Sequence, residues 1–139
     1  MVQTLTEIRA MLDAYGLHPK HRFGQNFLHD HNQLRKIMDA AAIAPGDVVL
    51  EVGPGTGALS EWLLEAGASV IAVEIDTDLG PVLRDRLGPR FGERFQLCMT
   101  DVLAGKHELS PVLFDALRKA GGGAVPPFKL IANLPYNVA

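Results

Sequence analysis

Four short apolar runs, separated by stretches of helical periodicity, constrain the fold of this chain more than any other feature. The first run, Val48–Val52, is rich in β-branched residues and lacks polar alternation. It therefore predicts a strand buried on both faces, as in a parallel sheet, whose strands are joined by crossover connections. The predicted strands are Val48–Val52, Ser69–Glu74, Phe95–Met99 and Lys129–Ala132.

Helical patterns lie before and between these runs. Apolar spacing predicts helices over Leu5–Tyr15, from a cap at Asp30 to about Ala41, and over Ala58–Ala66, Leu79–Leu87 and Ser110–Ala120. Such alternation indicates βαβ units with right-handed crossovers. The predicted fold is α/β, a doubly wound, mainly parallel Rossmann-like sheet. We expect residues 1–44 to form N-terminal helices and a loop, and residues 45–139 to form the sheet.

Composition excludes several classes of protein. The 139 residues suffice for one domain with a real core, and 47% of them are hydrophobic. No apolar run approaches the roughly 18 residues that span a bilayer, and no secretory signal is visible. The single cysteine, Cys98, excludes an internal disulfide and fits a reducing cytoplasm. It is expected to be a buried hydrophobe, and no metal site is predicted.

Charge is distributed unevenly. The net charge is −3, and residues 45–101 hold ten acids against four arginines. Lys20 and Arg22 form a small basic cluster ahead of this acidic region. Judged by charge alone, that cluster favours a solvated loop over a phosphate-binding patch.

Ligands in parallel α/β sheets bind at the carboxyl ends of the strands. Here the first strand runs into a G-x-G-x-G turn that includes Gly53 and Gly55. Glycines allow close backbone approach, and the next helix points free N–H groups toward a ligand. The alternative is a tight turn without a ligand. Glu74, at the end of the second strand, is placed to accept hydrogen bonds from both hydroxyls of a ribose; the alternative is a surface acid that caps the next helix.

The third strand is followed by Asp101, whose carboxylate can accept a hydrogen bond from an adenine amino group. Ile75 and Val102 would lie on either side of the ring. The alternative is an ordinary turn residue.

The fourth strand is followed by Asn133-Leu134-Pro135-Tyr136. The Asn133 side-chain oxygen and the carbonyl of Leu134 or Pro135 supply two acceptors for the hydrogens of an aromatic amine. Tyr136 can stack on a flipped base. Catalysis would then be mostly positioning and electrostatics. The alternative is a proline turn with a core tyrosine.

Five motifs stand in order along almost the whole chain: Lys20–Leu28, Val49–Leu59, Val73–Asp76, Thr100–Val102 and Asn133–Asn137. Together they resemble those of S-adenosylmethionine-dependent adenine-N6 methyltransferases. The resemblance is greatest to the N-terminal part of ribosomal small-subunit RNA adenine dimethyltransferases of the KsgA/RsmA type.

This resemblance implies S-adenosylmethionine as cofactor. It implies N6,N6-dimethylation of two adjacent adenosines in a hairpin loop near the 3′ end of 16S small-subunit RNA, during ribosome biogenesis. The implied cofactor residues are Gln25, Asn26, Leu28, Gly53, Gly55, Glu74, Ile75, Asp101, Val102 and Asn133. The implied catalytic residues are Asn133, Leu134, Pro135 and Tyr136, and Lys20 and Arg22 would contact RNA.

Other classes of function stay open from the sequence. Macrolide-resistance enzymes, which modify an adenine of large-subunit RNA, share these motifs, and a non-catalytic ribosomal RNA-binding module and a Rossmann oxidoreductase are further alternatives. The resemblance also implies later strands and a C-terminal helical domain that this chain lacks. We therefore expect a fragment with little or no catalysis, able to self-associate through its unpaired fourth strand.

Overall fold

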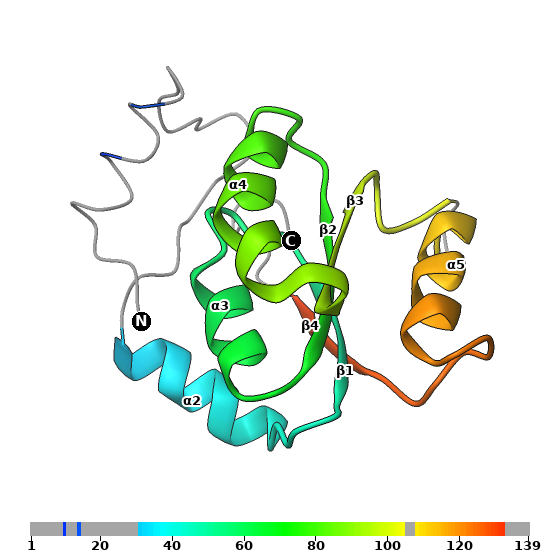
Figure 1. Cartoon of the computed structure of the whole chain (residues 1–139), viewed down its shortest axis with the longest axis horizontal. Helices are drawn as coiled ribbons and strands as arrows, with labels where there is room; N and C mark the ends of the chain where they lie inside the picture. Colours follow the sequence, from blue (N-terminus) through cyan, green and yellow to red (C-terminus); the bar gives the residue numbers. More distant parts are fainter. Residues whose placement is uncertain (1–9, 11–13, 15–30, 105–107, 133–139) are drawn as a thin grey trace.

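The fold is described by a computed structural model for residues 10, 14, 31–104 and 108–132. Its centre is a four-stranded sheet with the order β3-β2-β1-β4, and every pair is parallel (Figure 1). The strands are β1 (Val48–Val52), β2 (Ser69–Glu74), β3 (Phe95–Met99) and β4 (Lys129–Ala132). The four predicted strands and the parallel α/β architecture are confirmed.

The position of each strand in the sheet explains its sequence. β1 and β2 lie in the middle and are almost entirely buried, which accounts for their lack of polar alternation. β4 lies at one edge of the described sheet and alternates between half-buried and exposed residues. Its Leu130 is 61% exposed.

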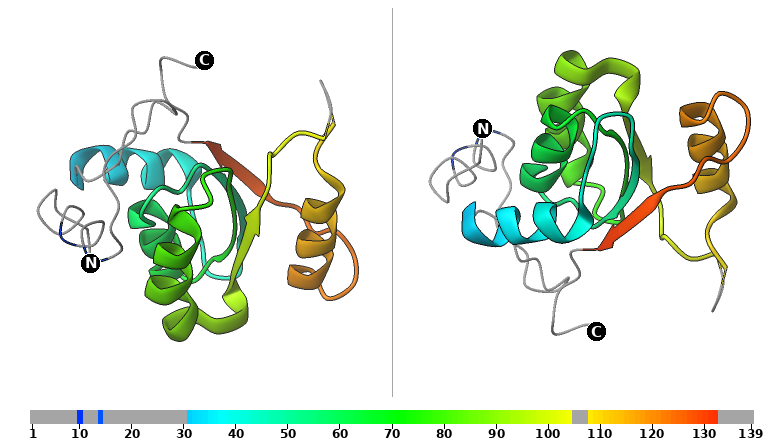
Figure 2. Two further views of the ribbon diagram at one scale, coloured as in Figure 1. Left: turned by 90° about the horizontal axis from the view of Figure 1, so that it is seen from above. Right: turned by 90° about the horizontal axis from the view of Figure 1, so that it is seen from below.

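Helices lie on both faces of the sheet. Three of them cover one face and the fourth covers the other (Figures 1 and 2). The first face carries α2 (His31–Ala41), α3 (Ala58–Glu65) and α4 (Leu79–Phe91), and the second carries α5 (Pro111–Ala120). A short 3-10 helix, η2 (Gly92–Arg94), leads from α4 into β3.

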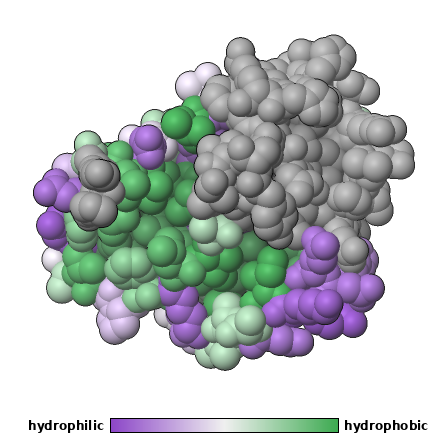
Figure 3. All heavy atoms as spheres, turned by 180° about the vertical axis from the view of Figure 1, so that it is seen from behind, coloured by the Kyte–Doolittle hydropathy of each residue, from purple (hydrophilic) through white to green (hydrophobic). Residues whose placement is uncertain are grey.

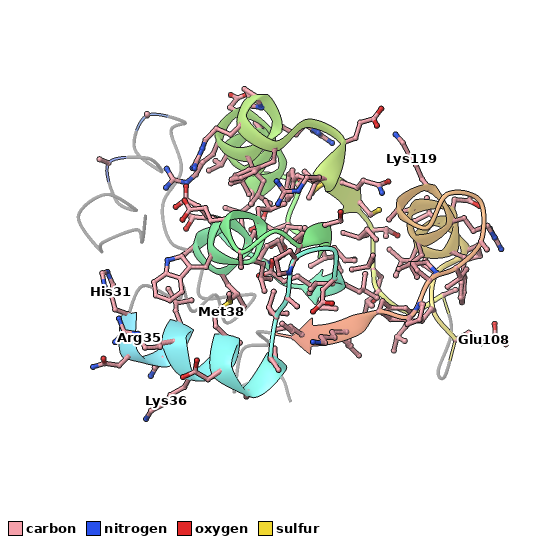
Figure 4. All side chains as sticks on the ribbon, turned by 60° about the horizontal axis from the view of Figure 1, so that its bottom comes forward. His31, Arg35, Lys36, Met38, Glu108 and Lys119 are labelled. Carbon is pink, nitrogen blue, oxygen red and sulfur yellow. The ribbon has the colours of Figure 1, made fainter. Side chains whose placement is uncertain are left out.

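The two faces have separate cores. On the first, Leu34 of α2 and Leu63 of α3 are fully buried, and Met38 points from α2 toward this core while Lys36 points away (Figure 4). On the second, Leu117 of α5 is fully buried. Cys98, predicted to be buried, is a free thiol only partly buried against this second core.

The prediction that the fourth helix ends at Leu87 is wrong. α4 continues through Gly88 and Pro89 to Phe91. Arg90 on this extension forms an ion pair with the buried Glu61 of α3 at 2.6 Å, and Phe91 packs against the first core. These tertiary contacts outweigh the helix-breaking tendency of the glycine and proline.

Helix starts agree only in part with the sequence patterns. Ser110, the first residue of the predicted helix, is the N-cap of α5 and Pro111 lies in its first turn, but the Ser110 side chain forms no capping hydrogen bond. The N-cap of α4 is Asp78, whose side chain forms no capping hydrogen bond. Asp76 instead holds the preceding loop, because its Oδ1 accepts a hydrogen bond from the Asp78 N–H at 3.0 Å. The helix predicted over Leu5–Tyr15 and the cap at Asp30 lie outside the described residues, Ala10 and Ala14 apart.

One side chain fixes β4 against α2. The Lys129 ammonium donates hydrogen bonds to the carbonyl oxygens of Ala41 (2.7 Å) and Ala42 (2.9 Å) at the end of α2. It also forms an ion pair with Asp47 at 3.0 Å. An ammonium group at the end of a helix is favourable because the last carbonyl groups of the helix lack intrahelical partners. The strand that leads to Asn133 is thereby positioned beside β1.

Candidate functional site

Parallel pairing brings the ends of the strands to one edge of the sheet. Val52 of β1 pairs with Val73 of β2 and with Ala132 of β4, and Glu74 pairs with Met99 of β3. At or just after these ends lie the predicted residues Gly53, Gly55, Glu74, Ile75, Asp101 and Val102. The structure thus gathers six of the predicted site residues, which come from three strand–helix connections.

The glycine turn has the backbone geometry that its sequence predicts. Gly53, Gly55 and Gly57 have φ angles of +73°, +61° and +89°, a region that residues with a Cβ atom rarely adopt. The Gly53 N–H donates to the Val73 carbonyl oxygen at 2.9 Å, which closes the turn onto β2. Gly57 is the N-cap of α3, so the free N–H groups of the first helical turn face this edge.

Glu74 joins the glycine turn to the end of β2. Its Oε1 accepts a hydrogen bond from the Gly55 N–H at 3.3 Å, and its Oε2 accepts one from the Asp76 N–H at 2.9 Å. Only 6% of Glu74 is exposed, and burial raises the pKa of its carboxyl although these N–H groups oppose the shift. A carboxylate has about four lone-pair positions, so two backbone donors leave capacity for further hydroxyl donors.

The residues expected around an adenine ring differ in exposure. Ile75 is 58% exposed, whereas Val102 is partly buried against the α5 core. Asp101 is exposed, and its Oδ1 accepts a hydrogen bond from the Leu103 N–H at 3.1 Å. Asp101 therefore stabilises its own turn through Oδ1. This hydrogen bond does not use its other carboxylate oxygen, Oδ2.

A second buried carboxyl, Glu51, lies below the glycine turn and was not predicted as a site residue. It is 1% exposed and accepts a hydrogen bond from the Ser60 hydroxyl of α3. Burial raises the pKa of Glu51 to about 7; the Ser60 hydrogen bond opposes the shift, and the charge of Glu74 adds to it. The only sequence signal was an acid inside an otherwise apolar run.

Several predicted residues lie outside the described part of the chain. They are Lys20, Arg22, Gln25, Asn26, Leu28, Asn133, Leu134, Pro135 and Tyr136. Within the described ranges, no group of three or more metal-ligating side chains gathers, and no helix has the length and apolarity needed to cross a membrane.

Comparison with known proteins agrees with this arrangement. The model of the family described as "Ribosomal RNA adenine dimethylase" matches residues 16–139. A Nocardia farcinica protein named ribosomal RNA small subunit methyltransferase A is 45% identical over 134 residues. A protein of the same name from Corynebacterium glutamicum is 46% identical over 134 residues. The chain belongs to the ribosomal RNA adenine dimethylase family.

Solved structures support the family and the fold. The 23S ribosomal RNA methyltransferase ErmE has a TM-score of 0.59 at 27% identity, over 81% of this chain and 39% of that protein. A dimethyladenosine transferase from Plasmodium falciparum has a TM-score of 0.58 at 27% identity, over 82% of this chain and 35% of that protein. The two bacterial relatives are each covered over 42% of their length, against 96% of this chain. The chain thus spans less than half of these dimethylase-family relatives.

Proposed function

We propose that this chain is the cofactor-binding part of an enzyme that dimethylates the N6 atoms of two adjacent adenosines in small-subunit ribosomal RNA. The observation that carries the proposal is the Glu74–Gly55 hydrogen bond, which sets a buried carboxylate beside a glycine turn at the carboxyl edge of the sheet. Membership of the ribosomal RNA adenine dimethylase family supports the class of reaction.

The described residues fit S-adenosylmethionine, which supplies an activated methyl group when bound. Glu74 retains lone pairs for the two ribose hydroxyls. Ile75 offers an exposed apolar surface to one face of the adenine, and Val102 would lie on the other. The Oδ2 atom of Asp101 would accept a hydrogen bond from the adenine amino group. Gly53 leaves the backbone open to close approach.

The residues beyond the described part complete the proposal. Gln25, Asn26 and Leu28 would close over the methionine end of the cofactor. Asn133 and the carbonyl group of Leu134 or Pro135 would hold the two hydrogens of the target amine, so that its lone pair points at the methyl group, and Tyr136 would stack on the base. Those roles follow from the family motifs.

The N-terminal segment, 1–44, would supply RNA contacts through Lys20 and Arg22, and 45–139 would supply the sheet. We place the protein in the cytoplasm, where ribosomes assemble. β4 would allow self-association of this chain, because it has a sheet neighbour on one side only among the described strands and leaves Leu130 exposed. Viewed from behind, the described surface includes a broad apolar area (Figure 3).

Calorimetric titration with S-adenosylmethionine tests the cofactor assignment. We expect the chain to bind, and Glu74→Gln to weaken binding by about 10- to 100-fold, because it removes charge-assisted hydrogen bonds to the ribose. Glu93→Gln is the matched control, since Glu93 is an exposed acid on η2, before β3 begins. Equal affinity of the Glu74 variant and the unaltered chain would contradict the role of Glu74.

RNA retention distinguishes the possible substrates. We expect the chain to retain a hairpin from the 3′ end of small-subunit RNA better than large-subunit RNA, and a Lys20→Ala, Arg22→Ala double variant to lose this retention. A preference for large-subunit RNA would favour the macrolide-resistance type of activity.

Labelled methyl transfer by the 139-residue chain is expected to be undetectable, and measurable transfer would show that this part alone is active.

A further inference from the structure

One polar contact at the amino edge of the sheet joins three segments that are distant in the chain. The ammonium group of Lys129, the first residue of β4, binds the carbonyl oxygens of Ala41 and Ala42 at the end of α2 and the carboxylate of Asp47, directly before β1. An ammonium group has three N–H donors, and these three acceptors match them. We call Lys129, Asp47, Ala41 and Ala42 the Lys129 cluster.

The cluster fixes how α2 joins β1. Among the described residues, Ala42 is the one non-glycine residue with a positive φ, +48°, a region that residues with a Cβ atom rarely adopt. The Ala42 N–H donates to the Asp39 carbonyl oxygen at 3.2 Å, and the Ala42 carbonyl oxygen accepts from Lys129 at 2.9 Å. Asp47 holds the same connection from its other end, because its Oδ2 also accepts a hydrogen bond from the Ala44 N–H at 2.9 Å.

β4 has few other contacts that fix its position. It pairs with β1 over four residues and has no second neighbour among the described strands. Leu130 is 61% exposed and Ala132 is also exposed, whereas Ile131 packs against the first core. Lys129 is the one polar side chain of the strand. The position of β4 therefore depends on the pairing with β1, on Ile131 and on the Lys129 cluster.

Both segments that the cluster holds lead to the same end of the proposed cofactor. Asn133, which the family motifs place among the cofactor residues, directly follows β4. Asn26 and Leu28, which would close over the methionine end, precede α2 by a few residues. The residues assigned to the ribose and the adenine, Glu74 and Asp101, instead lie at or after the ends of β2 and β3, which the cluster does not include.

We propose that Lys129 is a positioning residue for the methionine end of S-adenosylmethionine. This inference rests on the proposed function. Lys129 lies at the opposite edge of the sheet from the ligand, so it acts through β4 and α2, whose positions set where Asn133 and the segment before α2 meet the methionine end. Loss of the cluster should therefore weaken recognition of the methionine end and leave recognition of the adenosine part unchanged.

Calorimetry of the 139-residue chain with two ligands tests this separation. S-adenosylmethionine carries the methionine end, and 5′-methylthioadenosine lacks it. Lys129→Met keeps a long side chain but removes the three donors. It should weaken binding of S-adenosylmethionine about three- to tenfold, as expected for the loss of one well-placed hydrogen bond, and change binding of 5′-methylthioadenosine less than about twofold. Equal weakening for both ligands, or for neither, overturns the inference, whereas an unaltered chain that binds neither ligand overturns the proposed function.

Three further variants separate positioning from a general loss of stability, with circular dichroism to verify that each chain is folded at the temperature of the titration. Lys119→Met removes an exposed lysine of α5, on the other face of the sheet, and should leave both affinities unchanged (Figure 4). Lys129→Arg keeps the charge and the donors, so it should recover part of the affinity for S-adenosylmethionine that Lys129→Met loses.

Asp47→Asn removes the ion pair but keeps a side-chain oxygen for the Ala44 N–H. It should weaken S-adenosylmethionine binding selectively and by a smaller factor, and it carries the same comparison if Lys129→Met does not fold. An unselective loss in Asp47→Asn, or a Lys129→Arg chain that binds S-adenosylmethionine no better than Lys129→Met, contradicts the proposal.

Discussion

Replacing Glu51 by glutamine should change how the free energy of unfolding depends on pH, and it should change the value at acidic pH much less. The side chain is 1% exposed, and its pKa rises from 4.5 in the reference state to about 7 in the folded chain. The folded state therefore binds the Glu51 proton more tightly than the unfolded state. The contribution of Glu51 to the free energy of unfolding is fully present below pH 4.5, and it is lost as the pH rises through 7.

The size of this effect follows from the two pKa values. Each unit of difference corresponds to about 1.4 kcal/mol, so ionisation of Glu51 costs the folded state about 3 kcal/mol in full. Most of that cost, about 2 to 3 kcal/mol, develops between pH 5 and pH 8. Glutamine has nearly the same volume, accepts the Ser60 hydrogen bond and cannot ionise.

Urea unfolding at a series of pH values from 5 to 8 is the appropriate assay. The free energy of unfolding of Glu51→Gln, minus that of the unaltered chain, should rise by about 2 to 3 kcal/mol over this range. Glu93→Gln, which alters an exposed acid on η2, should give a curve parallel to that of the unaltered chain. Parallel curves for Glu51→Gln as well would refute the assignment of a proton to this buried carboxyl.

Three further substitutions test the glycine turn, helix α4 and the ligand surface. Gly57→Ala should destabilise the chain by about 1 kcal/mol or more, since φ is +89° and the added Cβ would lie 3.0 Å from Leu87 Cδ1 and 3.1 Å from Leu83 Cδ2. Gly88→Ala in α4 is the control, because a Cβ atom added there would have no neighbour within 4 Å, and it should stabilise the chain slightly. Urea unfolding measures both variants, and an equal change in the free energy of unfolding for Gly57→Ala and Gly88→Ala would contradict the geometry of the turn. Ile75→Ser should leave stability nearly unchanged and weaken S-adenosylmethionine binding several-fold by calorimetry, because Ile75 is 58% exposed; unaltered affinity would remove it from the ligand surface.

The sequence predicted the strands better than the helix ends. Val48–Val52 and Ser69–Glu74 are buried on both faces, so their composition alone identifies them as inner strands of a parallel sheet. The end of α4 was missed because Gly88 and Pro89 are local breaking signals. The contacts that carry the helix past them, from Arg90 to Glu61, join residues 29 positions apart.

The site shows the same division between local and tertiary information. Glu74 was identifiable from the sequence because a glycine turn after one strand and an acid at the end of the next strand together form a recognisable ribose-binding pattern. Glu51 was missed, because an isolated acid in an apolar run predicts only a strand. Its protonation depends on burial, on Ser60 of the next helix and on Glu74 of the next strand, which only the fold brings together.

Equilibrium dialysis of methyl-labelled S-adenosylmethionine against the 139-residue chain tests most directly whether the glycine turn and Glu74 form a site for a methyl donor. We expect the chain to retain the label, excess S-adenosylhomocysteine to displace it, and excess NAD⁺ to leave it bound. Failure to retain the label, or displacement by NAD⁺ as effective as that by S-adenosylhomocysteine, would contradict this assignment.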